Sequence, residues 1–283
     1  HKTKIPAATT YSSVVSRDSV RIALTIAALN DLDVLACDIQ NAYLCADCRE
    51  RIWVRAGPEF GSEAGQPIRV VKALYGLRSS GAAFRSLLAE TLNSLGYKPT
   101  YADPDVWMRP AVKADGFEYY EYILTYVDDI LSISADPFTT MKGIQAVFKL
   151  KDDKIAEPDV YLGATLSKME IDGQTCWTMS PEQYVQAAVA NVEENLAKSG
   201  RRLPSKCVTP FSCHYEPWLE TSAELKADGV QCFQELIGAL RWAVEIGRVD
   251  ILLEVSLLST YLASPREGHL EQAIHIFGYL KDH

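Results

Sequence analysis

The chain has 283 residues, of which 48% are hydrophobic, and its formal net charge is −9. This length and composition allow a sizeable buried core and two packed subdomains. No apolar run reaches the roughly 18 consecutive residues that a membrane-spanning helix needs. The acidic balance is the opposite of the basic surface expected of a protein that binds duplex nucleic acid, although basic residues cluster at 149–151 and 198–202.

The cysteines and the first residue give two further expectations. Seven cysteines, an odd number, are scattered along the chain, which favours a reducing compartment over a secreted disulfide framework. Cys45 and Cys48 have the spacing of half a zinc site, but no second pair repeats it, so we expect free thiols. Because the sequence begins with His and not Met, we interpret it as part of a longer open reading frame.

Short strands and helices alternate in the first part of the chain. Ser16 is a suitable N-cap for a helix that starts at Asp18, and a strand-like run over 32–39 follows it. Strand–helix–strand order with antiparallel pairing predicts an α+β fold in which helices back a sheet. The further predicted elements are strands at 52–54 and 68–71, a helix at 80–95, strands at 106–109 and 117–126, and a helix at 137–149.

The chain changes character near residue 180. Two strands, near 160–168 and 175–179, come before a helix over 181–197, for which Ser180 is a candidate N-cap with Pro181 at the first helical position. A proline-containing loop and long helical tracts then follow. We therefore predict a sheet-rich domain over 1–179 and a helical domain over 180–283.

Asp128 and Asp129 interrupt an apolar run at a predicted hairpin tip. Strand-like residues 122–127 precede them and 130–134 follow, and Asp tolerates the positive φ of a two-residue hairpin turn. Two carboxylates about 4 Å apart repel by roughly 4 kcal/mol at an effective dielectric constant near 20. A divalent cation such as Mg²⁺ would cancel that repulsion. For the pair alone, a solvated turn is the simpler explanation.

Asp38 is a second acidic residue at the end of a strand-like run. It lies far upstream of Asp128 and Asp129, so only the fold could bring the three together. By itself Asp38 is a strand terminator. Together with the Asp pair it becomes a candidate ligand, because carboxylates from different strand ends are what a two-metal phosphoryl-transfer site requires.

Several segments, in the expected order, resemble the motifs of copia-type retrotransposon reverse transcriptases. The sequence Tyr-Val-Asp-Asp resembles the family's Tyr-x-Asp-Asp motif, and Leu-Tyr-Gly-Leu-Arg is similar to its Leu-Tyr-Gly-Leu-(Lys/Arg) segment. The resemblance covers nearly the whole chain, down to residues 278–281, which look like the tail leading to a ribonuclease H domain. The matching segments are 38–44, 73–84, 103–107, 126–129 and 161–163.

The resemblance implies an RNA-directed DNA polymerase that joins a primer 3′-OH to a deoxynucleoside triphosphate with two Mg²⁺ ions, or Mn²⁺. Asp38 and Asp128 would bind both ions, with the Ile39 carbonyl as a further ligand. Asp129 would be the weaker ligand, since adjacent strand residues point to opposite faces.

The resemblance also implies contacts to the nucleotide. Tyr43 would be the steric gate against a ribonucleotide 2′-OH, and the backbone N–H groups of Asn41 and Ala42 would receive triphosphate oxygens. Tyr75 and Gly76 would lie against the incoming nucleotide, where glycine allows close backbone approach.

Arg78 could contact a phosphate or remain a solvated loop arginine. Primer contacts are implied for Tyr126, Val127, Tyr161, Leu162 and Gly163.

By the same resemblance, residues 1–179 would form partial fingers and a palm with a primer-grip hairpin, and residues 180–283 a helical thumb and connection-like region. The implied partners are an RNA or DNA template with its primer, deoxynucleoside triphosphates, and ribonuclease H and integrase portions of the same polyprotein, with no membrane. The implied location is intracellular, in a cytoplasmic virus-like particle or the nucleus. Three alternatives stay open. The first is a catalytically inactive retroelement remnant, and the second is a nucleic-acid-binding or assembly module, against which the acidic balance argues. The third is another two-metal palm enzyme such as a nucleotidyl cyclase, against which the Leu-Tyr-Gly-Leu-Arg and Tyr-x-Asp-Asp segments argue together.

Overall fold

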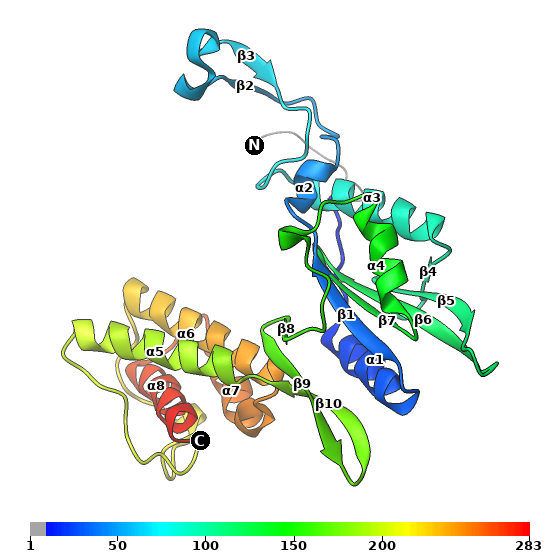
Figure 1. The fold of residues 1–283 in the computed structure, drawn as a ribbon. Coiled ribbons are helices and arrows are strands. Elements are labelled where there is room, and N and C mark those ends of the chain that lie inside the picture. Colours follow the sequence, from blue (N-terminus) through cyan, green and yellow to red (C-terminus); the bar gives the residue numbers. More distant parts are fainter. Residues whose placement is uncertain (1–9) are drawn as a thin grey trace. The chain divides into compact units, whose positions relative to one another are not determined.

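The computed structural model describes residues 10–283, and residues 1–9 of the first predicted domain lie outside it. The chain divides into two compact units, one ending at Pro158 and one beginning at Asp159 (Figure 1). Each unit has its own hydrophobic core. Both combine antiparallel sheet with helices, as the predicted α+β class requires.

A five-stranded antiparallel sheet forms the centre of the first unit, with the strand order β1-β7-β6-β5-β4. Its middle strands are long and apolar, and β7 is buried on both faces, which explains why the sequence shows continuous hydrophobicity there rather than alternation. The strands are β1 (Asp33–Asp38), β4 (Lys98–Pro99), β5 (Val106–Val112), β6 (Glu118–Tyr126) and β7 (Asp129–Ser134).

Helices cover both faces of this sheet. Helices α3 (Ser80–Ser94) and α4 (Pro137–Gln145) pack on the face that contains Ile130, together with the buried Phe84. Helix α1 (Arg17–Leu29) contacts β1 and β7 on the face that carries Leu131, because successive strand residues alternate in direction (Figure 1). As predicted, the Ser16 side chain accepts a hydrogen bond at the start of α1, from the Ser19 amide.

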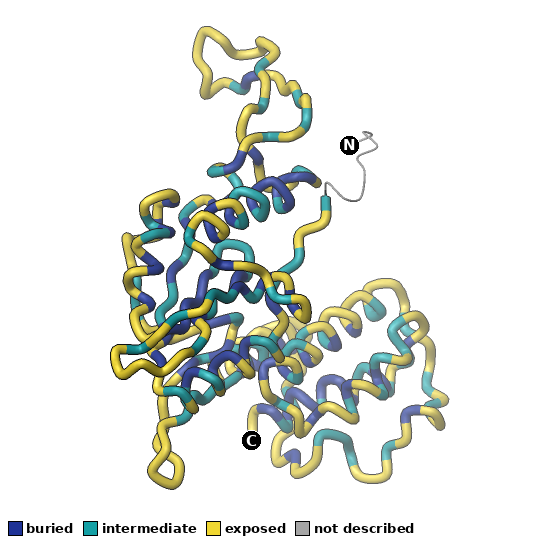
Figure 2. The backbone as a smooth tube through the Cα atoms, turned by 90° about the vertical axis from the view of Figure 1, so that its right-hand side faces the viewer, coloured by how far each residue is buried: buried dark blue, intermediate teal, exposed yellow. Residues whose placement is uncertain are grey.

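A hairpin projects from the first unit between α2 (Ala42–Cys45) and α3 (Figure 1). Its strands β2 (Trp53–Arg55) and β3 (Pro67–Arg69) pair only with each other, around the 3₁₀ segment η2 (Pro58–Glu63). Most of the hairpin is exposed (Figure 2). A second 3₁₀ segment, η3 (Lys151–Asp153), follows α4.

The second unit is a three-stranded antiparallel sheet, of order β10-β9-β8, followed by helices. Its core contains Val189, Phe233, Leu240 and Phe277 from three helices. None of the helices in the described chain is both long and apolar enough to cross a membrane. The elements are β8 (Val160–Tyr161), β9 (Ala164–Ile171), β10 (Gln174–Ser180), α5 (Glu182–Lys198), η4 (Pro217–Leu219), α6 (Ala227–Ile246), η5 (Val249–Ile251), α7 (Leu252–Ser259) and α8 (Glu267–Asp282).

The division between the units differs from the predicted boundary at residue 179. Strands β8–β10 belong to the helical unit, because β9 contacts α5 and the β8–β9 turn lies against α6. The helix predicted over 137–149 ends at Gln145, where a turn over 146–148 leads to Leu150, which pairs with Ile39 just beyond β1. At α5 the N-cap position is Pro181, although the Ser180 hydroxyl still accepts a hydrogen bond from the Glu182 amide.

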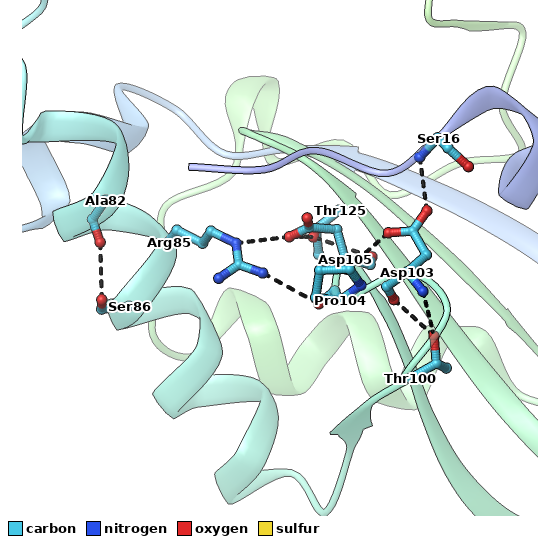
Figure 3. A network of polar contacts seen from close by, with 9 residues as sticks. All are labelled: Ser16, Ala82, Arg85, Ser86, Thr100, Asp103, Pro104, Asp105 and Thr125. Carbon is cyan, nitrogen blue, oxygen red and sulfur yellow. Dashed lines mark hydrogen bonds and ion pairs between the residues drawn. The ribbon is translucent and has the colours of Figure 1, made fainter. Parts of the chain in front are cut away.

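A polar network around Asp103 and Asp105 joins several elements of the first unit (Figure 3). Asp103 Oδ2 accepts hydrogen bonds from the Ser16 amide at 2.9 Å and the Ser19 hydroxyl at 2.7 Å. Burial raises the pKa of the Asp103 carboxyl, but hydrogen bonds from Ser16, Ser19 and the Asp105 amide outweigh it and hold the pKa below its ordinary value of 3.8. Asp105 Oδ1 in turn accepts a hydrogen bond from Arg85 Nε at 2.9 Å.

We expect Asp103→Asn to destabilise the protein by about 1–2 kcal/mol at neutral pH, because charge-assisted hydrogen bonds are lost from a buried carboxylate. Since the folded-state pKa is depressed, the stabilisation is fully present above pH 3.8 and is lost as the pH falls through the folded pKa. Urea unfolding should therefore show a difference in the free energy of unfolding between the parent and Asp103→Asn that is smaller at pH 3 than at pH 7. The exposed Asp33→Asn is the control, and an equal cost of Asp103→Asn at both pH values would contradict the assignment.

Candidate active site

Strand pairing brings together the three aspartates that are far apart in the sequence. Strand β1 lies antiparallel to β7 in a register that sets Asp38 directly opposite Asp129. The Ile39 amide then donates to the Asp128 carbonyl at 2.9 Å, which ties the end of β1 to the adjoining turn. Directly opposed residues have Cβ atoms about 4.5–5.5 Å apart on the same face of the sheet. The aspartates therefore gather at one end of the strand pair.

The turn between β6 and β7 consists of Val127 and Asp128, because Tyr126 pairs with Asp129. The predicted turn of Asp128 and Asp129 is thus wrong by one residue: Asp129 is already the first residue of β7. The positive φ falls on Val127, at 56°. A β-branched residue in this region is strained, and such strain is typical of functional sites.

This one-residue shift removes the argument that made Asp129 the weaker ligand. Asp128 lies in the turn, so strand alternation does not set its direction relative to Asp129. Asp129 is the direct cross-strand neighbour of Asp38. Any difference between the two residues as ligands therefore cannot come from opposite faces of one strand.

The carboxylates repel each other in a half-buried environment. Burial, followed by the charges of Asp128 and Asp38, raises the pKa of Asp129 to about 6. Burial and then the charge of Asp38 also raise the pKa of Asp128. The site therefore favours a cation that would neutralise these groups.

Lys151 supplies one positive charge at this site. Residues 149–156 cover the free edge of β1: the Gln40 amide donates to the Lys149 carbonyl at 2.9 Å, and Ala36 pairs with Ala156. This edge pairing carries Lys151 Nζ to 3.2 Å from Asp38 Oδ2. The sequence shows Lys151 only as part of a basic cluster, because its contact with Asp38 depends on the pairing of distant segments.

The carboxylate oxygens of the three aspartates are the type of ligand that a hard divalent cation such as Mg²⁺ prefers. In residues 10–283, however, no three His, Cys, Asp or Glu side chains converge closely enough to form a metal-binding group. The Lys151 ammonium beside Asp38 shows that this part of the site accommodates a positive charge. The fit therefore rests on the donor chemistry and on the raised pKa values of Asp128 and Asp129.

The predicted nucleotide-contacting residues of the first unit lie on two adjoining segments. Tyr43, on α2, packs against Tyr75 with the ring centroids 4.6 Å apart and the ring planes tilted by 45°. Asn41 caps α2 in the left-handed conformation, directly before Ala42. Gly76 also has a positive φ, of 89°. Arg78 follows in the same loop and is exposed.

The predicted primer-contacting residues are divided between the two units. Tyr126 and Val127 end β6 and begin its turn. In the second unit, Leu162 and Gly163 both have positive φ and form the two-residue turn between β8 and β9, which is the type I′ pattern. A Cβ at Gly163 would lie 3.3 Å from Trp242 Nε1.

We expect Asp129→Asn to stabilise the protein by about 1–2 kcal/mol at neutral pH in the presence of a chelator, because it removes one of three mutually repelling, half-buried charges. Thermal unfolding is the measurement. Asp33→Asn, at the other end of the same strand pair, is a matched control that should change little. A thermal unfolding midpoint that is lower for Asp129→Asn than for the parent would show that the Asp129 carboxylate stabilises the fold.

The chain is similar in sequence to several known proteins. Residues 3–198 match the family model described as reverse transcriptase (RNA-dependent DNA polymerase). The chain is 26% identical over 280 residues to the retrovirus-related Pol polyprotein from transposon TNT 1-94 of Nicotiana tabacum, covering 96% of this chain and 20% of that protein. It is 28% identical over 246 residues to a putative transposon Ty5-1 protein of Saccharomyces cerevisiae, covering 86% of this chain and 74% of that one.

A third relative is the transposon Ty1-DR5 Gag-Pol polyprotein of the same yeast, which is 24% identical over 277 residues, covering 96% of this chain and 15% of the polyprotein. The chain spans only about a fifth (20%) of the length of the tobacco polyprotein. The family model covers well over half of this chain, and the relatives are named for retrotransposons. The chain belongs to the reverse transcriptase (RNA-dependent DNA polymerase) family, as a domain of the copia retrotransposon type.

Proposed function

We propose that this chain catalyses RNA-directed DNA synthesis, in which a primer 3′-OH attacks the α-phosphate of a deoxynucleoside triphosphate and pyrophosphate leaves. The register of β1 against β7 carries this proposal, because it sets Asp38 opposite Asp129 and beside Asp128. Three carboxylates from two separate chain segments, half-buried and mutually repelling, are costly unless they bind cations.

Asp38, Asp128, Asp129 and the Ile39 carbonyl would hold two Mg²⁺ ions, which Mn²⁺ could replace. When bound, such ions activate the attacking oxygen and stabilise the charge that develops on the phosphate. The protein's own contribution is to hold the carboxylates at fixed strand ends. Lys151 balances the charge of Asp38.

The segments next to the aspartates would bind the nucleotide. The amides of Asn41 and Ala42, at the start of α2, would receive triphosphate oxygens. Tyr43 would exclude a ribose 2′-OH. Gly76 would allow close approach of the backbone to the nucleotide, and the exposed Arg78 would contact a phosphate.

The primer would lie along Tyr126 and Val127, and the turn at Tyr161, Leu162 and Gly163 would hold its 3′ end. Residues 1–179 would then act as palm with partial fingers, and residues 180–283 as thumb and connection-like region. Two observations support a gripping role for the turn. Both of its central residues have positive φ, and a Cβ at Gly163 would lie 3.3 Å from Trp242 Nε1, so the turn packs closely against α6.

The partners would be deoxynucleoside triphosphates and a template with its primer. The template would be RNA first and DNA afterwards. Relatives of this chain are named as Pol and Gag-Pol polyproteins. We therefore infer that ribonuclease H and integrase portions of the same polyprotein assist this domain. The net charge of −9 makes binding through broad electrostatic attraction unfavourable, so basic surface from such portions would strengthen template binding.

Primer extension on an RNA template tests the proposal. With Mg²⁺ or Mn²⁺ the parent should extend the primer, and Asp128→Asn should abolish extension while its thermal unfolding midpoint stays at or above that of the parent, because a repelled carboxylate has been removed. Primer extension by Asp128→Asn would contradict the role of Asp128 as a metal ligand. Absence of extension in both proteins, despite folding, would instead favour an inactive retroelement remnant.

The sugar selectivity of the same reaction tests Tyr43. We expect Tyr43→Ala to raise the use of ribonucleotides at least about tenfold, because it removes a steric clash of more than roughly 1.4 kcal/mol with the 2′-OH. Single-nucleotide incorporation with paired deoxy- and ribonucleotides measures this ratio. The steric-gate assignment fails if the preference for deoxynucleotides is unchanged in the variant.

A further inference from the structure

Tyr75 lies in a turn that fixes the direction of its side chain. The Leu77 amide donates to the Leu74 carbonyl at 3.2 Å, and Gly76 has a φ of 89°. A positive φ at the third residue is what a type II turn requires, and only glycine adopts it without strain. The buried Ser80 hydroxyl also donates to the Leu74 carbonyl, at 2.6 Å. The turn is therefore fastened to the first residue of α3.

This turn brings the Tyr75 ring into contact with Tyr43. The two ring centroids are 4.6 Å apart and the ring planes meet at 45°. Tyr43 also contacts Phe84, with centroids 6.4 Å apart and the rings edge to face. Phe84 is only 1% exposed and contacts Phe148 in the core. Tyr43 thus contacts both a buried core residue and the exposed ring of Tyr75.

Tyr75 is 63% exposed, so burial of its own surface does not explain its position. Tyr43 lies on α2, which begins four residues after Asp38, the last residue of β1. Burial, followed by the charges of Asp128, Tyr43 and Asp38, raises the pKa of the Tyr75 hydroxyl, in agreement with this position. The ring pair therefore lies beside the group of carboxylates. A tyrosine at this place can influence which sugars the site accepts.

We propose that Tyr75 is a positioning residue that holds the Tyr43 ring in place and thereby sets the selection of deoxyribose over ribose. This inference rests on the proposed function, in which Tyr43 is the steric gate. Without the Tyr75 ring, Tyr43 keeps its contact with Phe84 but can rotate outward, and the space for a 2′-OH opens. Loss of an aromatic contact of this kind would change the ratio of kcat/KM for deoxy- and ribonucleotides about three- to tenfold.

Two measurements on one set of variants test the proposal. The variants are Tyr75→Ala, Tyr75→Phe and Leu74→Ala, an exposed neighbour in the same turn that serves as the control. The first measurement is the ratio of kcat/KM for deoxy- and ribonucleotides, also determined in a Tyr43→Ala background. We expect Tyr75→Ala to lower the ratio about three- to tenfold, chiefly through a lower KM for the ribonucleotide, and Tyr75→Phe to restore it.

The Tyr43→Ala background separates the positioning role from direct contact with the nucleotide. If Tyr75 acts through Tyr43, then Tyr75→Ala adds nothing further once Tyr43 is absent. A full effect of Tyr75→Ala in that background overturns the proposal, because Tyr75 then touches the nucleotide itself. An unchanged ratio in the Tyr43-containing protein overturns it as well.

The second measurement does not depend on polymerase activity. N-acetylimidazole acetylates exposed tyrosine hydroxyls, and the tryptic peptide covering 22–49 contains Tyr43 as its single tyrosine. We expect Tyr43 to be acetylated several-fold faster in Tyr75→Ala than in the parent, Tyr75→Phe or Leu74→Ala. Equal rates in all four proteins would overturn the proposal even if primer extension succeeds. If Tyr43 is acetylated faster in Tyr75→Ala but the chain extends no primer, the contact between the two rings is supported and the proposed function is rejected.

Discussion

The antiparallel pairing of β1 with β7 is the constraint on which the proposed active site depends. It joins two chain segments that are distant in sequence, and its register sets Asp38 opposite Asp129. A slip of one residue would turn Asp38 to the other face of the sheet, because side chains alternate along a strand. The register is fixed by buried residues on both faces of β7, against α1 on one side and α4 on the other.

The packing of the sheet also explains how the protein tolerates three neighbouring carboxylates. Burial and mutual repulsion raise the pKa values of Asp128 and Asp129, so these side chains oppose folding when they are ionised. The apolar strands behind them supply the compensating stabilisation. Lys151 moderates the repulsion from the covered edge of β1. The site is thus electrostatically destabilised and held in place by the core, as is common where function requires a specific arrangement of charge.

The part of the site that we propose binds the nucleotide is built from turns and not from strands. Gly76 gives the loop before α3 its positive φ, and Asn41 gives one to the start of α2. These two turns bring Tyr43 and Tyr75 into contact. Selection of the sugar would therefore depend on two loops that are both anchored to α3, through Ser80 and Phe84.

The sequence by itself determined the α+β class, most helices and strands of the first unit, and the family, because hydrophobic periodicity, capping residues and short motifs are local properties of the chain. It also identified Asp38, Asp128 and Asp129 as candidate metal ligands, and the strand register brings Asp38 opposite Asp129. Only the tertiary structure decided that Val127, and not an aspartate, takes the positive φ, that Lys151 reaches Asp38, and that β8–β10 belong to the helical unit. These features depend on strand register and on packing between distant segments, about which local patterns carry no information.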